Sequence, residues 1–343
     1  MSSTKIFITG ATGYIGGSVL SRLLAHPEAK SFEFTALARS AEKAAKLNTV
    51  GVKTVLGSYS DLDLLTKSAK EADIVIAVAD SDNLPAAEAI LKGQKEKFEE
   101  TGKAPILIHT SGTAIISDDA RGQHGDHTIY SDLDSDAIEA LPETALHRNV
   151  DIATVKADKE GYVTAYLITP GTVFGLAEGP LVDIGVQHKY SIQLPLFIKV
   201  SAARKKAGYI GAGKNLWAAA SNRDTADLFV LIFNAARKNP SSLGHGRDGF
   251  YFVENAEYSG FEVAEETGKV LAELGIAESP EATSNTAEEL KQFFGDWWTL
   301  LSTNSRAKGD RSRAVGWKPV DGKKEFIQSI RPEVLEVVKS IEK

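Results

Sequence analysis

The chain has 343 residues, 43% of them hydrophobic and 25% charged, and these ordinary globular values exclude disordered, collagen-like and membrane-embedded classes. Its net charge of −7 is spread along the chain without a basic run, which argues against a nucleic-acid surface. The absence of cysteine excludes disulfides, a thiolate nucleophile and cysteine-ligated metal. We find no signal-type N-terminus and no apolar run of membrane-spanning length. We therefore expect a cytoplasmic protein with a small-molecule substrate, no membrane or nucleic-acid partner, and a homodimer as the possible assembly.

Short β-type runs alternate with longer helical stretches through the first half of the chain. The pattern predicts strands at residues 5–9, 32–37, 53–56, 74–77, 106–110 and 162–168, and helices at residues 14–24, 41–47 and 84–101. Such alternation implies right-handed crossovers. The fold class is therefore α/β, a doubly wound parallel sheet of the Rossmann type with helices on both faces.

The pattern loosens after Pro170 into "GTVFGLAEGPLVDIG", a stretch that leaves the carboxyl end of the last strand, where ligands bind in such sheets. A helix at residues 225–238 and a strand at 250–253 then return to the sheet, and the chain from Phe261 onward has a mostly helical pattern. We predict a dinucleotide-binding domain of residues 1–170 and 217–258. Residues 171–216 and 259–343 are expected to form a smaller, discontinuous, mainly helical substrate lobe.

The turn after the first strand, "TGATGYIGG", has glycine at positions 10, 13 and 16. Glycines at this spacing let the backbone turn tightly, approach a pyrophosphate and pack the following helix against the strand. That helix then points its free N–H groups at the phosphate. A tight turn that binds nothing is the alternative, but the alternating strand before it and the amphipathic helix after it favour a dinucleotide site.

The end of the second strand selects the dinucleotide. The sequence "ALARSAEK" places Arg39 and Ser40 there, with Lys43 close behind and no acidic residue at the strand end. A guanidinium matches the oxygens of a ribose 2′-phosphate, whereas NAD needs an acidic partner for its 2′-hydroxyl. The sequence therefore favours NADP (NADPH) over NAD, although an ordinary solvated arginine is the alternative.

Two further stretches fit a cofactor groove. Asp61 in "GSYSDLDLL" is expected beside the adenine ring, and the small residues Ala77 and Ala79 leave room beside the ribose. The complete set of residues expected at the cofactor is Gly10, Thr12, Gly13, Tyr14, Ile15, Gly16, Arg39, Ser40, Lys43, Asp61, Leu62, Ala77, Ala79, His147, Pro170, Thr172 and Val173.

The chain resembles the extended or atypical short-chain dehydrogenase/reductases of the epimerase/dehydratase type. Four stretches carry the resemblance: TGATGYIGG, HTSGT, TPGTVFG and RSRAVGWKP. The resemblance covers nearly the whole chain. It implies a catalytic Ser or Thr after the fifth strand and a Tyr-x-x-x-Lys pair on the next helix. In that family the tyrosine transfers the proton that accompanies hydride transfer, and the lysine lowers the tyrosine pKa and binds the nicotinamide ribose. By this resemblance Ser111 is the catalytic Ser, with Thr113 as its neighbour.

The Tyr-x-x-x-Lys pair is absent, because no tyrosine of this chain is followed four residues later by lysine. Counting back from the sixth strand, "LPETALHRNVDIATVKADKEG" occupies the dyad helix, with Glu143 at the tyrosine position and His147 at the lysine position. We expect His147 to help seat the nicotinamide ribose, since imidazole bonds hydroxyls and titrates near neutrality. A surface histidine without a role is the alternative.

The proton donor must then come from elsewhere. Tyr130, in the polar segment "GQHGDHTIYSDLD" before the dyad helix, is the predicted donor, and a loop tyrosine that only covers the cofactor is the alternative. His124, Asp126 and His127 form a metal-like triplet without a further fixed ligand, so we expect no metal.

The leading functional hypothesis is an NADP-dependent oxidoreductase that reduces a small carbonyl or related group. A nucleotide-sugar epimerase or dehydratase is one alternative, with a diphosphate cradle formed by Lys199, Arg204, Lys205 and Lys206. The other alternative is a non-catalytic NADP-binding regulator resembling the NmrA-like redox sensors, which the missing dyad favours.

Overall fold

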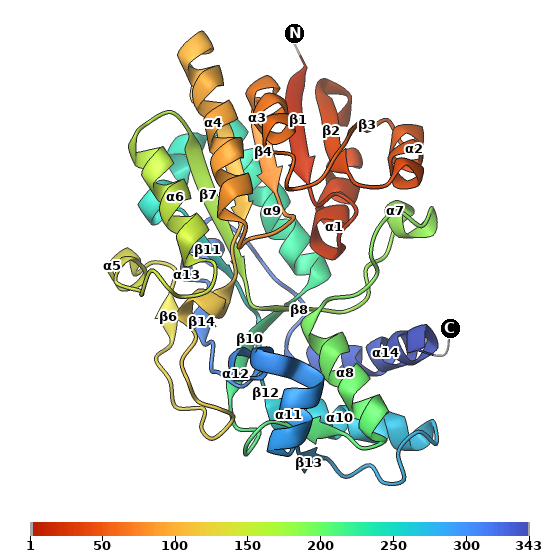
Figure 1. Ribbon diagram of the computed structural model, residues 1–343. Helices are drawn as coiled ribbons and strands as arrows, with labels where there is room; N and C mark the ends of the chain where they lie inside the picture. Colours follow the sequence, from red (N-terminus) through yellow and green to blue (C-terminus); the bar gives the residue numbers. More distant parts are fainter. Residues whose placement is uncertain (1–2, 342–343) are drawn as a thin grey trace.

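A computed structural model describes residues 3–341. Its centre is a sheet of seven strands in the order β11-β7-β5-β4-β1-β2-β3, in which every neighbouring pair is parallel (Figure 1). The strands are β1 (Thr4–Thr9), β2 (Phe32–Ala38), β3 (Lys53–Leu56), β4 (Ile74–Ala77), β5 (Ile106–Thr110), β7 (Thr164–Pro170) and β11 (Phe250–Val253). The predicted α/β class with a doubly wound parallel sheet is confirmed.

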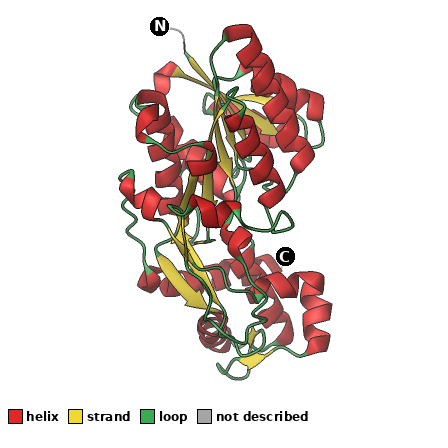
Figure 2. Cartoon of the chain, turned by 90° about the vertical axis from the view of Figure 1, so that its left-hand side faces the viewer, coloured by secondary structure: helices red, strands yellow, loops and turns green. Residues whose placement is uncertain are grey.

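Helices cover both faces of this sheet (Figure 2). On one face α1 (Tyr14–Leu24) packs against α9 (Asn222–Lys238), and on the other α4 (Leu84–Thr101) packs between α3 (Leu62–Glu71) and α6 (Arg148–Lys159). Helix α2 (Ala41–Thr49) lies beside β2 and β3. Alternate residues of β1 enter the two cores, since Ile8 belongs to the cluster under α1 and α9 and Phe7 to the cluster under α3 and α4.

The strand order reverses between β1 and β4, which are direct neighbours in the sheet. The turn after β1 and the loop after β4 therefore leave the same edge in opposite directions. Such a reversal opens the crevice where ligands bind in open α/β sheets.

The second lobe is built around a three-stranded sheet in the order β12-β10-β8. Its strands are β8 (Thr172–Phe174), β10 (Leu216–Ser221) and β12 (Ala256–Ser259), and its long helices are α8 (Gln193–Arg204), α10 (Gly260–Glu273) and α14 (Lys323–Ile341). Phe326, Leu271 and Trp217 are buried in one cluster that joins these helices to the sheet. This lobe is mainly helical, as the sequence predicts.

Short elements complete the chain. They are β6 (Tyr130–Ser131) paired with β14 (Ala307–Lys308), β9 (Gly208–Tyr209) paired with β13 (Thr283–Ser284), and the helices α5 (Ser135–Glu139), α7 (Pro180–Asp183), α11 (Ala287–Phe294), α12 (Trp298–Leu301) and α13 (Asp310–Ala314). Within residues 3–341, no helix combines the length and the apolar character needed to cross a membrane.

Several elements differ from the sequence prediction, and β7 and α3 show why. Strand β7 begins at Thr164, two residues late, because Gly161 turns the chain with a φ of 84° and Tyr162 lies at the surface under the Lys95 ammonium. Helix α3 was not predicted, because its "LDLLTKSAKE" has few apolar positions and buries Leu65 and small side chains instead of a broad apolar stripe.

Candidate functional site

The glycine turn links β1 to α1 and has the geometry of a phosphate cradle. Gly10 has a φ of 73°, and a Cβ on Gly16 would lie 2.2 Å from the Gly10 carbonyl oxygen, so the fold itself requires glycine at both positions. Gly13 differs, because its φ is −81° and a Cβ would meet no protein atom closer than 3.1 Å. Gly13 is the N-cap of α1, and no side chain caps the helix N-terminus there. The Gly13 N–H donates to the Gly10 carbonyl at 2.8 Å, and the first turn of α1, which no side chain caps, is the part whose backbone N–H groups suit the pyrophosphate of a dinucleotide.

The end of β2 carries unpaired positive charge. Arg39 is exposed, and neither Arg39 nor Lys43 has an ion-pair partner in the described part of the chain. Ser40 accepts a hydrogen bond from the Lys43 backbone N–H at 3.3 Å and is the N-cap of α2. These contacts hold the two cations at the strand end, where the ribose of a dinucleotide lies in such folds.

Several other predicted cofactor residues are engaged within the protein. The Tyr14 hydroxyl donates to the Gly175 carbonyl, and burial, followed by the charge of Glu333, raises the pKa of Tyr14 well above its usual value. The Thr172 hydroxyl lies 2.7 Å from the Tyr258 hydroxyl. Asp61 accepts from the Ser58 backbone N–H within its own turn. Their roles toward a cofactor stay predictions.

The second part of the site lies where α6 begins. His147 is the N-cap of α6 and has a φ of 68°, a left-handed conformation that is costly for a non-glycine residue. The Asp82 carboxylate, from the loop after β4, holds it there by accepting the His147 backbone N–H at 2.9 Å and lying 2.9 Å from the ring Nδ1. The Ser81 hydroxyl lies 3.0 Å from the same nitrogen. Strain that is held by such specific contacts is typical of functional positions.

The contact with His147 favours the ionised form of Asp82. Burial raises the pKa of Asp82, but the hydrogen bonds and charge of His147 outweigh it, so that the net pKa lies below the ordinary aspartate value. Asp82 is therefore ionised at neutral pH and orients the imidazole through Nδ1.

The other ring nitrogen points toward the end of β5. A Cβ on Gly112 would lie 2.7 Å from His147 Nε2, so glycine at position 112 makes room for the imidazole. Within residues 3–341 no hydrogen bond to Nε2 is formed, and Nε2 is free to bond a ligand. The histidine thus has one nitrogen on a carboxylate and the other at the ligand edge of the sheet.

Ser111 is turned away from this edge. Its hydroxyl donates to Asp151 Oδ2 at 2.9 Å, and both side chains are buried. Burial raises the pKa of Asp151 to about 7, against the lowering effect of the Ser111 hydrogen bond. Because its hydroxyl proton is committed to Asp151, Ser111 does not offer that proton to a substrate.

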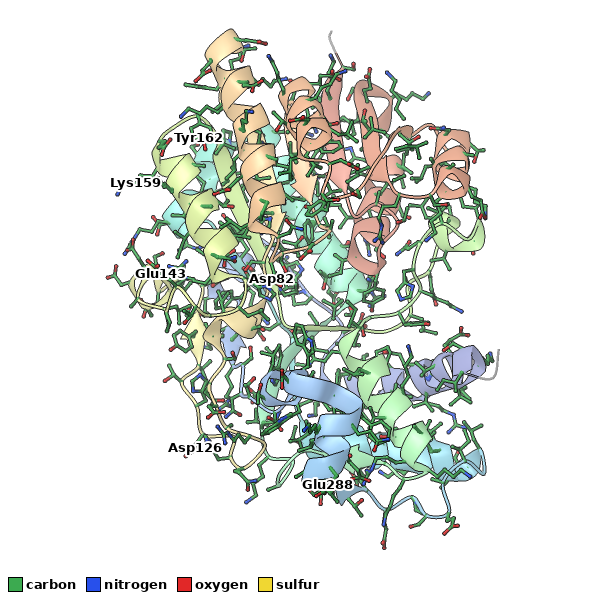
Figure 3. The ribbon with its side chains drawn as sticks, in the orientation of Figure 1. Asp82, Asp126, Glu143, Lys159, Tyr162 and Glu288 are labelled. Carbon is green, nitrogen blue, oxygen red and sulfur yellow. The ribbon has the colours of Figure 1, made fainter. Side chains whose placement is uncertain are left out.

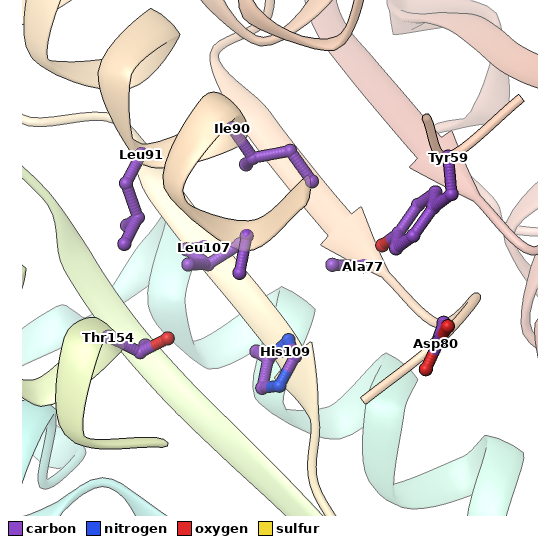
Figure 4. Close-up of a pocket in the computed structure, with 9 residues that line it drawn as sticks. Tyr59, Ala77, Asp80, Ile90, Leu91, Leu107, His109 and Thr154 are labelled. Atoms are coloured by element: carbon purple, nitrogen blue, oxygen red, sulfur yellow. The ribbon is translucent and has the colours of Figure 1, made fainter. Parts of the chain in front are cut away.

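A second histidine lies behind the site. His109, on β5, borders a cavity of about 10 Å³ together with Thr154, Tyr59 and Asp80, a volume that fits one water molecule (Figure 4). Burial, then the charge of His147, lowers the pKa of His109 to about 4. His109 is therefore neutral at neutral pH, and of the two histidines His147 has the carboxylate partner.

Two predictions about the dyad helix are corrected by the structure. Glu143 does not occupy the tyrosine position, because α6 begins only at Arg148 and Glu143 lies on the preceding turn. Glu143 is exposed at the periphery of the molecule, whereas Asp82 lies at the centre (Figure 3). The pair four residues apart at the start of the helix is His147 and Asp151. His147 thus takes the first position of the pair and not the lysine position.

Tyr130 lies elsewhere. It forms β6, its backbone N–H donates to the Arg306 carbonyl, and its ring packs beside His127 against a separate apolar cluster. None of its contacts in the described chain is with Ser111 or His147. The structure therefore gives no support to Tyr130 as the proton donor.

Sequence reasoning missed Asp82, Ser81 and Asp151. The available signals were the polar run "DSDN" directly after a buried strand and the four-residue spacing between His147 and Asp151. The run "DSDN" follows Ala79, and Asp151 follows His147, and both of these neighbours were predicted site residues. Neither signal is informative until the start of α6 at Arg148 is known.

Comparisons with known proteins identify the nucleotide-binding domain and its relatives. The family model described as NAD(P)H-binding matches residues 10–131. The oxidase ucsJ of an Acremonium species is 31% identical over 334 residues, covering 92% of this chain and 93% of the relative. The uncharacterized protein YLL056C of Saccharomyces cerevisiae is 27% identical over 323 residues, covering 92% and 94%.

Solved structures show the same fold at low sequence identity. The PbgP3 protein of Burkholderia pseudomallei aligns with a TM-score of 0.67 at 14% identity, over 98% of both chains. The UDP-glucose 4-epimerase of Thermotoga maritima aligns with a TM-score of 0.64 at 11% identity, over 98% of this chain and all of the other. The 31% identity over 92% of this chain shows that the chain belongs to the same family as the oxidase ucsJ, with an NAD(P)H-binding domain, and the solved structures show that it shares the fold of PbgP3 and of the UDP-glucose 4-epimerase.

Proposed function

We propose that this protein is an NADP-dependent oxidoreductase that reduces a small carbonyl or related group, with His147 as the proton donor. The observation that carries the proposal is the Asp82–His147 pair at the ligand edge, 2.9 Å apart, with Nε2 unbonded. An imidazole held by a carboxylate through one nitrogen and free at the other is a recurrent general acid–base arrangement.

The preference for NADP is supported by the end of β2. An arginine and a lysine without acidic partners, at a strand end without a carboxylate, suit a 2′-phosphate and not a 2′-hydroxyl. The space at Gly13 and the open N-terminus of α1 suit the pyrophosphate.

The chemistry then divides between cofactor and protein. Bound NADPH supplies a hydride for the carbonyl carbon. His147, as imidazolium, gives its Nε2 proton to the carbonyl oxygen, so that the C=O double bond becomes CH–OH. Asp82 keeps the remaining proton on Nδ1 and stabilises the positive charge before transfer, and solvent then restores the Nε2 proton. Ser111 and Asp151 act as positioning residues, because their hydrogen bond ties the end of β5 to the first turns of α6.

The epimerase or dehydratase alternative loses one of the four residues of its proposed diphosphate cradle. Arg204 pairs with Glu289 at 2.8 Å and its side chain is only 7% exposed, so it serves the lobe's own structure. The sensor alternative stays the main competitor, because cofactor binding by itself does not require His147.

The test measures NADPH consumption by the purified chain across aldehydes, ketones and imines, beside NADPH and NADH binding. The variants are His147→Asn, which tolerates the left-handed backbone and transfers no proton, and Asp82→Asn. We expect His147→Asn to lower kcat about 10²- to 10⁴-fold with NADPH affinity unchanged. Asp82→Asn should lower kcat about tenfold, because the imidazole loses the carboxylate that holds its Nδ1 and its backbone N–H in place.

His124→Gln is the matched control, since His124 pairs with Asp126 on an exposed loop and should leave turnover unchanged. Tight NADPH binding without turnover of any substrate would reject the enzyme and favour the sensor. Turnover that survives His147→Asn would reject His147 as the donor.

A further inference from the structure

One segment of the second lobe crosses over to the dinucleotide domain. Residues 176–190, which we call the strap, follow β8 and include α7 (Figure 1). Leu181 and Val186 are fully buried in the core beneath α1 and α9. The Gln187 side-chain amide donates to the Tyr14 carbonyl at 2.9 Å and to the Ser18 hydroxyl at 2.8 Å. The strap is therefore fastened to α1 by apolar packing and by buried hydrogen bonds.

This fastening places His188 at the glycine turn. The His188 backbone N–H donates to the Thr12 carbonyl at 3.0 Å, within the turn between Gly10 and Gly13. The imidazole is exposed and lies edge-on against the Tyr190 ring, with 4.5 Å between the ring centroids. A titratable side chain thus lies beside the phosphate cradle on a rigid backbone.

The charges around His188 are positive. Partial burial lowers the pKa of His188, and the charges of Lys43 of α2 and Lys199 of α8 lower it further. The neighbouring lysines are neutralised by partners, since Lys46 pairs with Glu42 and Lys189 with Glu336. By contrast, Lys43, Lys199 and Arg39 form no ion pair in the described residues. Lys43 and Lys199, which both act on His188, and Arg39 at the end of β2 are thus available to a polyanionic ligand.

We propose that His188 is a ligand of the 2′-phosphate of NADP, completing with Arg39 and Lys43 a site that closes over the adenosine end of the cofactor. The inference rests on the proposed use of NADP. In this arrangement the strap supplies a third residue beside Arg39 and Lys43, so that both lobes of the protein contribute to the preference for NADP over NAD.

A phosphate between His188 and the lysines removes the repulsion that disfavours the imidazolium, so NADPH binding takes up a proton on His188. Binding of NADPH therefore weakens as pH rises through the titration of the imidazole, whereas binding of NADH does not. The 2′-phosphate has a titration of its own, and the difference between wild type and His188→Gln separates the two.

The experiment measures dissociation constants of NADPH, NADH and adenosine 2′,5′-bisphosphate by calorimetry on the full chain, in two buffers of different ionisation enthalpy. His188→Gln is compared with wild type and with His124→Gln, and thermal unfolding of each variant verifies the fold. We expect His188→Gln to weaken NADPH and the bisphosphate about tenfold, to leave NADH within about twofold, and to abolish the buffer-dependent proton uptake.

Equal weakening of NADPH and NADH would overturn the assignment, because it would place His188 at the pyrophosphate or give it a purely structural role. Unchanged affinity for all three ligands would also overturn it. Selective weakening of NADPH in a protein that turns over no substrate would support His188 while rejecting the proposed enzyme. Wild-type protein that binds NADH as tightly as NADPH would overturn the inference and leave the oxidoreductase standing.

Discussion

The glycine turn and the start of α6 lie at the same edge of one sheet, yet they are encoded in different ways. The turn is specified by seven consecutive residues, Gly10 to Gly16, of which Gly10 and Gly16 are required to be glycine by their own backbone contacts. The second region brings together Asp82, Gly112 and His147 from three separate loops, and only the strand order makes them neighbours. A site that depends on backbone shape is local in the sequence, whereas a site that depends on side-chain pairing needs the topology.

The largest expected effect is that of Gly16→Ala. The added Cβ would meet the Gly10 carbonyl oxygen at 2.2 Å, and because both atoms belong to tightly packed backbone, α1 must move away from β1. We expect a loss of about 3 kcal/mol in the free energy of unfolding, in the range of overpacked cores, together with loss of detectable NADPH binding. Urea unfolding and calorimetry measure the two quantities. Retention of wild-type stability would show that the turn is not as tightly fixed as its geometry indicates.

Gly13→Ala tests whether glycine at position 13 is required for cofactor binding and not for folding. Position 13 has an ordinary φ, and an added Cβ would lie 3.1 Å from the Gly10 carbonyl oxygen, a close contact that a shift of a few tenths of an ångström relieves, so the loss in the free energy of unfolding should stay near about 1 kcal/mol, well below that of Gly16→Ala. The same methyl group would occupy the space assigned to the pyrophosphate, and we expect the NADPH dissociation constant to rise about 10- to 100-fold. An unchanged dissociation constant would mean that the phosphates lie elsewhere.

The sequence predicted the elements of the first domain closely, because their apolar periods and glycine turn are local. Strand β3, strand β4, strand β5 and helix α4 begin and end at the predicted residues. The register around His147 was misread because it was counted from a strand that begins two residues later, and because α6 starts at Arg148, with His147 as its N-cap, and not upstream. Asp82 stabilises the unusual backbone of His147 from 65 residues away, which no periodicity reveals.

Asp151→Asn tests whether the buried pair behind His147 is structural. Burial raises the pKa of Asp151 to about 7, far above that of an aspartate in the unfolded chain. The folded state therefore holds a proton that the unfolded state has lost, and stability falls as pH rises from about 4 to about 7. Asparagine keeps an acceptor for Ser111 without titrating, so the variant should lose about 1–2 kcal/mol less than wild type between pH 5 and pH 8.

Glu333 provides the internal reference for that measurement. It is buried on α14, and burial raises its pKa to about 7 as well, so it contributes a decline of the same sign that remains in the variant. Unfolding by urea at several pH values gives the comparison. A variant with the full wild-type decline would show that Asp151 is ionised in the folded protein.

The smallest effect is expected for Tyr130→Phe. Its ring packs beside His127 on β6, and its contacts do not reach the start of α6, so removal of the hydroxyl should change kcat by less than about twofold. The kcat of His147→Asn in the same assay is the comparison, because loss of the true proton donor must lower kcat, whether that donor is the phenol or the imidazole. A large loss in Tyr130→Phe would mean that β6 moves toward the cofactor during turnover. The site would then consist of three regions: the local glycine turn, the assembled Asp82–His147 region and a mobile β6.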